Sequence, residues 1–87
     1  MKGHRLPDDW LLSSDDIGGY CRRSGDGVWE CVTPNGRVGG LDDHQVMEHE
    51  DGTITVSPSI LVAAEQVGDV ELPGWHGYLE HGTWREC

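Results

Sequence analysis

The sequence predicts an all-β protein: a small, single-domain antiparallel sandwich or partly open barrel of about six or seven short strands. Three observations lead to this prediction. Thirteen of the 87 residues are glycine, turn-forming dipeptides recur along the chain, and several runs alternate β-branched and polar residues. Because glycine tolerates the positive φ angles of tight turns and weakens helices, we expect the strands to be connected as hairpins.

The whole chain, residues 1–87, is expected to form one domain, because its length is near the lower limit for a single hydrophobic core. Residues 1–14 are predicted to be an N-terminal arm or lid with at most one short helical turn, over Leu6–Ser13. Residues 15–87 are predicted to be the β core. There is no phenylalanine, so the four tryptophans must build much of that core.

The first predicted hairpin lies in the N-terminal half of the chain. Its strands are expected over Ile17–Arg23 and Val28–Thr33, joined by the turn cluster Ser24–Gly27. Pro34-Asn35-Gly36 has the composition of a second turn. The stretch Arg37–Asp43 is then predicted to be a flexible connection.

The segment from His44 to Val62 has the clearest strand pattern. Asp51-Gly52 predicts a tight turn between strands at about Gln45–His49 and Thr53–Ser57. Pro58 has no N–H to donate, so it should interrupt the ladder or lie at an edge. A further apolar strand is expected over Ser59–Val62.

The C-terminal part predicts another hairpin. Ala63–Asp69 is expected to be a loop with weak helical character, followed by a short strand at Val70–Leu72. After the Pro73-Gly74 turn, two strands should meet at His81-Gly82.

The charge balance restricts the class of partner. Sixteen acidic residues against six basic ones give a net charge of −10, which disfavours nucleic acid and anionic membrane surfaces as partners. The N-terminus lacks the apolar run of a secretory signal, and no segment has the ~20 apolar residues of a membrane span. The three cysteines include no CxxC pair, so we expect free thiols in a reducing, cytoplasmic compartment.

Cys31, His44 and His76 are the candidate metal ligands. Thiolate and imidazole are the usual ligands of zinc, and a structural metal would stabilise so small a core. The spacing of these residues matches no standard zinc ribbon or finger. The sequence therefore leaves two alternatives, no cofactor or zinc.

The same residue types offer a hydrolase alternative, with Cys31 or Ser59 as nucleophile and His44 or His76 as base. The sequence supplies no oxyanion hole, so the expectation leans towards a protein that is not an enzyme. Aromatic side chains left outside the core are the alternative functional feature, because Trp and Tyr dominate protein interfaces. The candidates for a protein-binding patch are Trp10, Tyr78 and Trp84.

Two segments, DGTITVSPSILV and GWHGYLEHGTW, resemble a family of small tailed-phage and bacterial proteins of unknown function, some of which carry a misleading ammonia monooxygenase label. The likeness runs from Trp29 to Trp84, is densest at the SPSI motif, and is greatest to members from phages of actinobacteria. Cys31 and His44 match the family's cysteine-bearing strand and later histidine, and Trp75–Gly82 matches its closing strand.

Many members of that family have a second cysteine, and their Cys-His pairs imply a metal site. Here Asn35 lies near the position of the second cysteine, and Trp75 directly precedes His76. A lost zinc site is therefore as well supported as a working one. The resemblance implies a phage protein in the host cytoplasm or in the virion.

These observations together predict a non-enzymatic, acidic phage protein that binds another protein. It would be either a small virion-associated component or a host-directed accessory factor. A virion component should carry an extended arm or an apolar patch that is buried only in an assembly, whereas a free host-directed binder should expose little apolar area. The competing prediction is a zinc-stabilised or zinc-dependent module that uses Cys31, His44 and His76.

Overall fold

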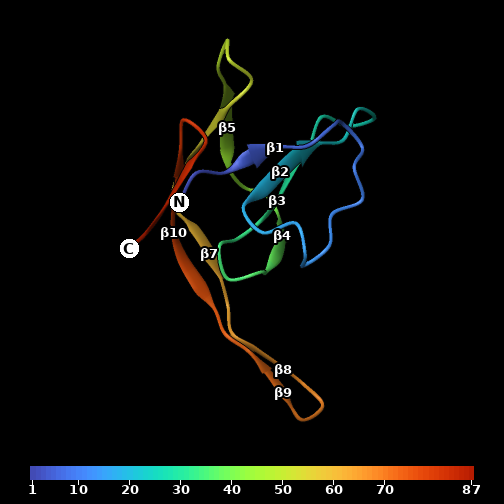
Figure 1. The fold of residues 1–87 in the computed structure, drawn as a ribbon, viewed down its shortest axis with the longest axis vertical. Helices are drawn as coiled ribbons and strands as arrows, with labels where there is room; N and C mark the ends of the chain where they lie inside the picture. The colour runs from blue at the N-terminus through green and yellow to red at the C-terminus, as the bar shows by residue number, and fades with distance from the viewer.

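The computed structural model describes residues 1–87 and confirms the all-β prediction. Eleven short strands form four small, open sheets, and the chain has no helix (Figure 1). Accordingly, no helix is long and apolar enough to cross a membrane. Two of the four sheets are two-stranded hairpins.

The largest sheet is built from the N-terminal half in the order β1-β2-β3-β4. Its strands are β1 (His4–Arg5), β2 (Gly19–Arg22), β3 (Trp29–Val32) and β4 (Val38–Gly40). The predicted β2–β3 hairpin is confirmed. β1 and β4 were not predicted. β1 gains its ladder only by pairing in parallel with β2. β4 lies within Arg37–Asp43, so this stretch is not the flexible connection that was predicted; it is ordered by pairing with β3.

The residues after β1 form an irregular segment with a tight turn at Asp8-Asp9, and not the helical turn that was considered for Leu6–Ser13. The backbone N–H groups of Leu6 and Asp9 donate to the carbonyls of Tyr20 and Arg22, so the segment follows β2. A single helical turn is too short to be stable by itself, and pairing with a formed strand competes successfully with it. This segment therefore continues along the edge of β2 on which β1 lies.

The Asp51-Gly52 hairpin is confirmed as β5 (Gln45–Glu48) and β6 (Ile54–Ser57), with Gly52 at φ 86°. The chain then passes a cis Ser57–Pro58 peptide and enters β7 (Ile60–Val62).

The C-terminal hairpin is also confirmed. It consists of β10 (Trp75–Glu80) and β11 (Thr83–Glu86), and its turn residues His81 and Gly82 both have positive φ. β7 pairs with the other edge of β10, which gives a three-stranded sheet in the order β11-β10-β7.

The stretch Ala63–Asp69 is not a loop with helical character. Glu65–Val67 forms β8, which turns at Gly68-Asp69 and pairs with β9 (Val70–Leu72). The ladder of β8 and β9 continues the ladder of β7 and β10 after a break of two residues on each strand, Ala63-Ala64 and Pro73-Gly74. Gly-Asp is a hairpin dipeptide, and the valines on either side of it are the signal from which this hairpin could have been predicted.

The hydrophobic core lies where the large sheet meets β6, β7, β10 and β11. Its aromatic centre includes Trp75 and Trp84, whose rings meet edge to face with centroids 5.4 Å apart. The indole N–H of Trp84 donates to the carbonyl of Gly18, 3.0 Å away, so its polar atom is satisfied. The clustered buried side chains are Tyr20, Trp29, Cys31, Leu41, Ile54, Val56, Ile60, Trp75, Leu79 and Trp84.

Candidate functional site

The hairpin of β8 and β9 projects from the body of the protein as an arm. Its two strands pair with each other and with no other strand. Figure 1 shows the arm extending well beyond the sheets, and the molecule accordingly measures 43 Å along its longest axis against 28 and 22 Å along the others. We call the segment Glu65–Leu72 the arm.

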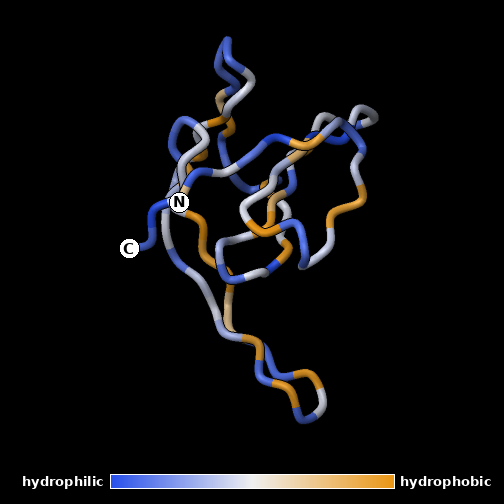
Figure 2. The backbone as a smooth tube through the Cα atoms, viewed as in Figure 1, coloured by the Kyte–Doolittle hydropathy of each residue, from blue (hydrophilic) through white to orange (hydrophobic).

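The two faces of the arm differ in polarity. The cross-strand pairs Val67↔Val70 and Glu65↔Leu72 share one face, whereas Gln66↔Glu71 occupies the other, because successive strand residues point to opposite sides. The side chains of Val67 and Val70 are 59% and 58% exposed. Figure 2 shows the resulting alternation of apolar and polar residues in the projecting hairpin. The arm thus has the pattern of a half-buried sheet, yet its apolar face is uncovered.

The arm begins where Pro73 and Gly74 break the ladder. Pro73 has no N–H to donate, and a Cβ on Gly74 would lie only 2.6 Å from the carbonyl oxygen of Val62. Glycine is therefore required for the close approach of the two strands at this point. The break leaves carbonyl groups without strand partners.

Arg37 satisfies these carbonyls. Its Nη1 donates to the carbonyl oxygens of Ala63 at 3.0 Å and Pro73 at 2.9 Å, and more weakly to that of Leu72 at 3.5 Å. Its Nη2 lies 3.2 Å from the Glu65 carboxylate. The Arg37 residue is only 9% exposed, so one buried guanidinium from the body binds both strands at the base of the arm.

The turn before β4 holds Arg37 in place. The backbone N–H of Arg37 donates to the Thr33 hydroxyl oxygen at 2.9 Å, and the Thr33 N–H donates to the Arg37 carbonyl at 2.8 Å. From the same turn, the Asn35 side-chain amide donates to the carbonyl of Gly74 at 3.1 Å. The direction of the arm is therefore set by side chains of the large sheet's β3–β4 turn.

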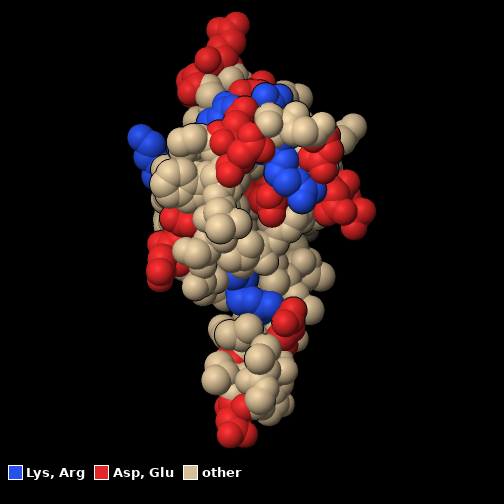
Figure 3. All heavy atoms as spheres, turned by 90° about the vertical axis from the view of Figure 1, so that its right-hand side faces the viewer, with Lys and Arg blue, Asp and Glu red and all other residues tan.

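The arm and its surroundings are acidic. Between Arg37 and Arg85 the sequence contains no Lys or Arg, while Glu65, Asp69 and Glu71 lie on the arm itself. In Figure 3 the arm is a narrow projection with acidic atoms at its tip and no basic atoms along its length. An apolar face flanked by carboxylates complements a partner surface with an apolar patch and Lys or Arg side chains.

The three predicted metal ligands occupy different environments. Cys31 is buried in β3, where desolvation raises the pKa of its thiol to about 12, with smaller contributions from Glu30 and Cys21. His44 and His76 instead both contact Ser59. No group of three or more His, Cys, Asp or Glu side chains is arranged so that it could hold a metal ion. All three cysteines are free.

Ser59 and His76 form the pair that the hydrolase alternative requires. The Ser59 hydroxyl lies 3.0 Å from Nε2 of His76, and Nε2 of His44 lies 3.2 Å from the Ser59 carbonyl oxygen. Cys87 Sγ also approaches Nε2 of His76, at 3.9 Å. His76 is exposed and has no carboxylate partner among its hydrogen bonds, so a nucleophile and a base are adjacent without the third group that orients the base.

The candidate binding aromatics are divided between surface and core. Trp10 is exposed in the segment that follows β1, and Tyr78 is half-buried under the guanidinium of Arg85, 4.6 Å from the ring centroid. Trp84 lies in the core and is 2% exposed. The aromatic residues therefore include one freely accessible indole, that of Trp10.

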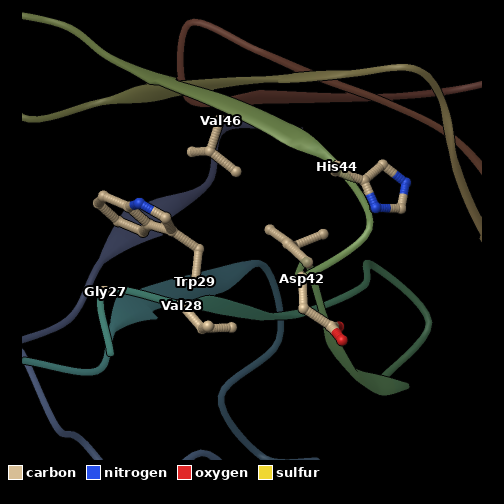
Figure 4. A pocket seen from close by; sticks show the side chains of 7 residues that line it. Gly27, Val28, Trp29, Asp42, His44 and Val46 are labelled. Atoms are coloured by element: carbon tan, nitrogen blue, oxygen red, sulfur yellow. The ribbon is translucent and has the colours of Figure 1, made fainter. Parts of the chain in front are cut away.

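A shallow pocket of about 260 Å³ lies between β3 and β5 (Figure 4). Val46 and Trp29 approach it from the two strands, and the imidazole of His44 points away from them. This volume is below the roughly 300–1,000 Å³ that is typical of small-molecule sites. The lining residues are Gly27, Val28, Trp29, Leu41, Asp42, His44 and Val46.

Comparison with known proteins gives no relative from which a role can be transferred. No protein-family model matches the chain, and neither a curated protein nor a solved structure matches it significantly.

Proposed function

We propose that this chain is a phage protein that works by binding another protein, as a small virion-associated component, and that the arm is its main contact. The observation that carries the proposal is the arm itself: an amphipathic hairpin that leaves the body with its apolar face in water. An extended arm is what we expect of a virion component, so the arm favours this role over that of a free host-directed factor.

The physical argument starts from the marginal stability of an isolated hairpin. Two strands without a packed face are barely stable in water, and full burial of a valine side chain contributes roughly 1.5–3 kcal/mol. Docking on a partner would cover Val67 and Val70 and stabilise the arm. Because Arg37 already holds the base of the arm, less conformational entropy is lost on binding.

The charge distribution favours a basic partner over a second copy of this chain. Each copy carries a net charge of −10, and the arm adds Glu65, Asp69 and Glu71 to the contact region. Like charges across an interface cost several kcal/mol. The partner is therefore a different protein, whose contact surface combines apolar residues with Lys or Arg. The phage origin is supported by the likeness of DGTITVSPSILV and GWHGYLEHGTW to the tailed-phage family.

The test is site-specific photocrosslinking in infected cells and in purified virions. A photoreactive phenylalanine analogue replaces Val67 in one sample and Met47 in the control, since Met47 is 64% exposed on β5 and lies outside the arm. We expect one discrete adduct from Val67, present in virions, that disappears when Val70→Asp is added. Equal adducts from both positions, or an adduct that survives Val70→Asp, would contradict the proposal.

The zinc-dependent module is separated from this proposal by metal analysis. Protein purified without chelator is assayed for zinc in the wild type and in Cys31→Ser. A stoichiometric metal that is lost in the variant would favour the metal module that uses Cys31, His44 and His76. A metal content unchanged by the substitution would exclude Cys31 as its ligand.

A further inference from the structure

We propose that the partner docks as an extended β-strand along the outer edge of β8. This inference rests on the proposed function, because it describes how the arm is used. It commits to an occupant of stated chemistry: a segment of another protein in which apolar residues alternate with Lys or Arg.

The turn of the arm determines which backbone groups are free. Gly68 has φ 59°, whereas Asp69 is not at positive φ, as in a type II′ two-residue turn. The pair that flanks such a turn, Val67 and Val70, is the hydrogen-bonded one. The next pair, Gln66 and Glu71, therefore points its N–H and C=O groups away from the ladder, towards the two open edges of the arm.

The two edges are not equivalent. Two residues from Gln66, beyond the end of β8, lies Ala64, whose N–H and carbonyl make no backbone hydrogen bond. Two residues from Glu71, the corresponding position belongs to Pro73, which has no N–H and whose carbonyl already accepts from Arg37. The β8 side therefore leaves the backbone groups of Gln66 and Ala64 unpaired, whereas the β9 side leaves only those of Glu71.

The side chains define the chemistry of the added strand. Its apolar residues would extend the face of Val67, Val70 and Leu72, and its intervening residues would lie beside Gln66 and Glu71 on the other face. Lys or Arg at those positions would lie on the same face as Glu71, with Gln66 between them. Strand addition of this kind takes affinity from main-chain hydrogen bonds and specificity from alternate side chains.

The experiment uses the full-length protein and a fluorescein-labelled peptide of alternating lysine and valine, with binding measured by fluorescence anisotropy. Gln66→Pro removes the outward N–H of β8 without removing a ladder hydrogen bond, and Gln66→Ala is its matched control. Glu71→Pro and Glu71→Ala test the other edge in the same way. A peptide of alternating glutamate and valine controls for charge, and a lysine–valine peptide N-methylated at every second residue controls for main-chain pairing.

We expect Gln66→Pro to raise the Kd of the lysine–valine peptide about tenfold or more, equivalent to about 1.4 kcal/mol, while Gln66→Ala changes it little. Glu71→Pro should behave as Glu71→Ala does, and the N-methylated peptide should bind weakly to the wild type. If Gln66→Pro disturbs the arm, main-chain pairing is still tested by comparing the binding of the methylated and unmethylated peptides to the wild type.

Each of the following results would overturn the inference. If the wild type does not bind the lysine–valine peptide, or binds the N-methylated form equally well, strand addition is wrong. If Val70→Asp weakens binding but Gln66→Pro does not, the arm remains the contact and only the docking mode is wrong. If neither variant weakens binding, the proposed function is contradicted as well. A dimer in sedimentation that Gln66→Pro dissociates would identify a second copy as the occupant.

Discussion

Nη1 of Arg37 lies 2.9 Å from the carbonyl oxygen of Pro73, and this hydrogen bond joins the turn between β3 and β4 to the base of a hairpin 36 residues further along the chain. Pro73 breaks the strand ladder, and Arg37 binds the carbonyls that the break leaves free. The residue that breaks the ladder and the residue that binds the free carbonyls are thus far apart in the sequence.

Replacing Arg37 with methionine should destabilise the protein and loosen the arm. The substitution leaves the partly buried carbonyls of Ala63 and Pro73 without their donor; a fully buried unsatisfied group costs about 1–3 kcal/mol, so the loss should lie at the lower end of that range. Urea unfolding gives the change in free energy, and amide hydrogen exchange over Glu65–Leu72 reports the arm. Arg23→Met is the control, because its ion pair with Asp26 is exposed and should contribute less than about 1 kcal/mol. An equal decrease in the free energy of unfolding in both variants would show that the Arg37 contacts stabilise the protein no more than an exposed ion pair does.

Truncating an arm valine should leave the free energy of unfolding nearly unchanged. Val70 is 58% exposed, so Val70→Ala should change it by no more than about 0.5 kcal/mol. Leu79 is fully buried, and Leu79→Ala should cost about 2–5 kcal/mol. Chemical denaturation of the two variants checks this contrast. A large loss from Val70→Ala would mean that the arm packs on the body, in conflict with its role as a free contact.

The thiols should react with Ellman's reagent at very different rates. Cys87 is exposed, whereas Cys21 and Cys31 are buried, and desolvation raises the pKa of both buried thiols, that of Cys31 to about 12. We expect fast modification of Cys87 in native protein and modification of the other two only on unfolding. Cys87→Ser should abolish the fast phase. Rapid native labelling in that variant would contradict the burial of Cys31 and Cys21.

Asp51 should titrate below its usual pKa of 3.8. The side-chain hydroxyl of Thr53, and secondly its backbone N–H, donate to the Asp51 carboxylate and lower its pKa. A carboxyl with a lowered folded pKa adds stability that is fully present above pH 3.8 and is lost as the pH falls through the folded pKa.

In Thr53→Val the Asp51 pKa should move up towards 3.8, as followed by carbon NMR of the carboxyl groups. Asp26 is an internal control in the same spectra, since its pKa is lowered mainly by the N–H of Val28 and should not respond. An Asp51 titration that is identical in the wild type and the variant would show that the hydroxyl does not contribute.

Much of the body of the fold could be predicted from local sequence. Asp51-Gly52 and His81-Gly82 both form tight turns between strands, because the residues that tolerate positive φ stand between runs of strand-forming residues. β1 and β4 could not be predicted in this way. Each consists of two or three residues with no strand pattern of its own, and each is stabilised by a neighbouring strand that is already formed.

The candidate site was harder to predict than the fold. A cluster of Cys31, His44 and His76 requires side chains from three distant segments to converge, and the spacing of the residues carries no information on that convergence. The structure brings two of them to Ser59 and keeps Cys31 in the core. The adjacency of Ser59 and His76 was one of several pairings that the sequence allowed, and only the β7–β10 register selects it.

By itself, the sequence determined the all-β class, the positions of the main turns and the strong acidity, because turns depend on the φ preferences of adjacent residues and charge is a sum over the chain. Only the tertiary structure decided which apolar residues stay in water. Val56 and Val70 both stand in short alternating strands, yet Val56 packs in the core and Val70 does not. The difference is that β6 lies against the other sheets, while Pro73, Gly74 and the buried Arg37 direct β9 away from them.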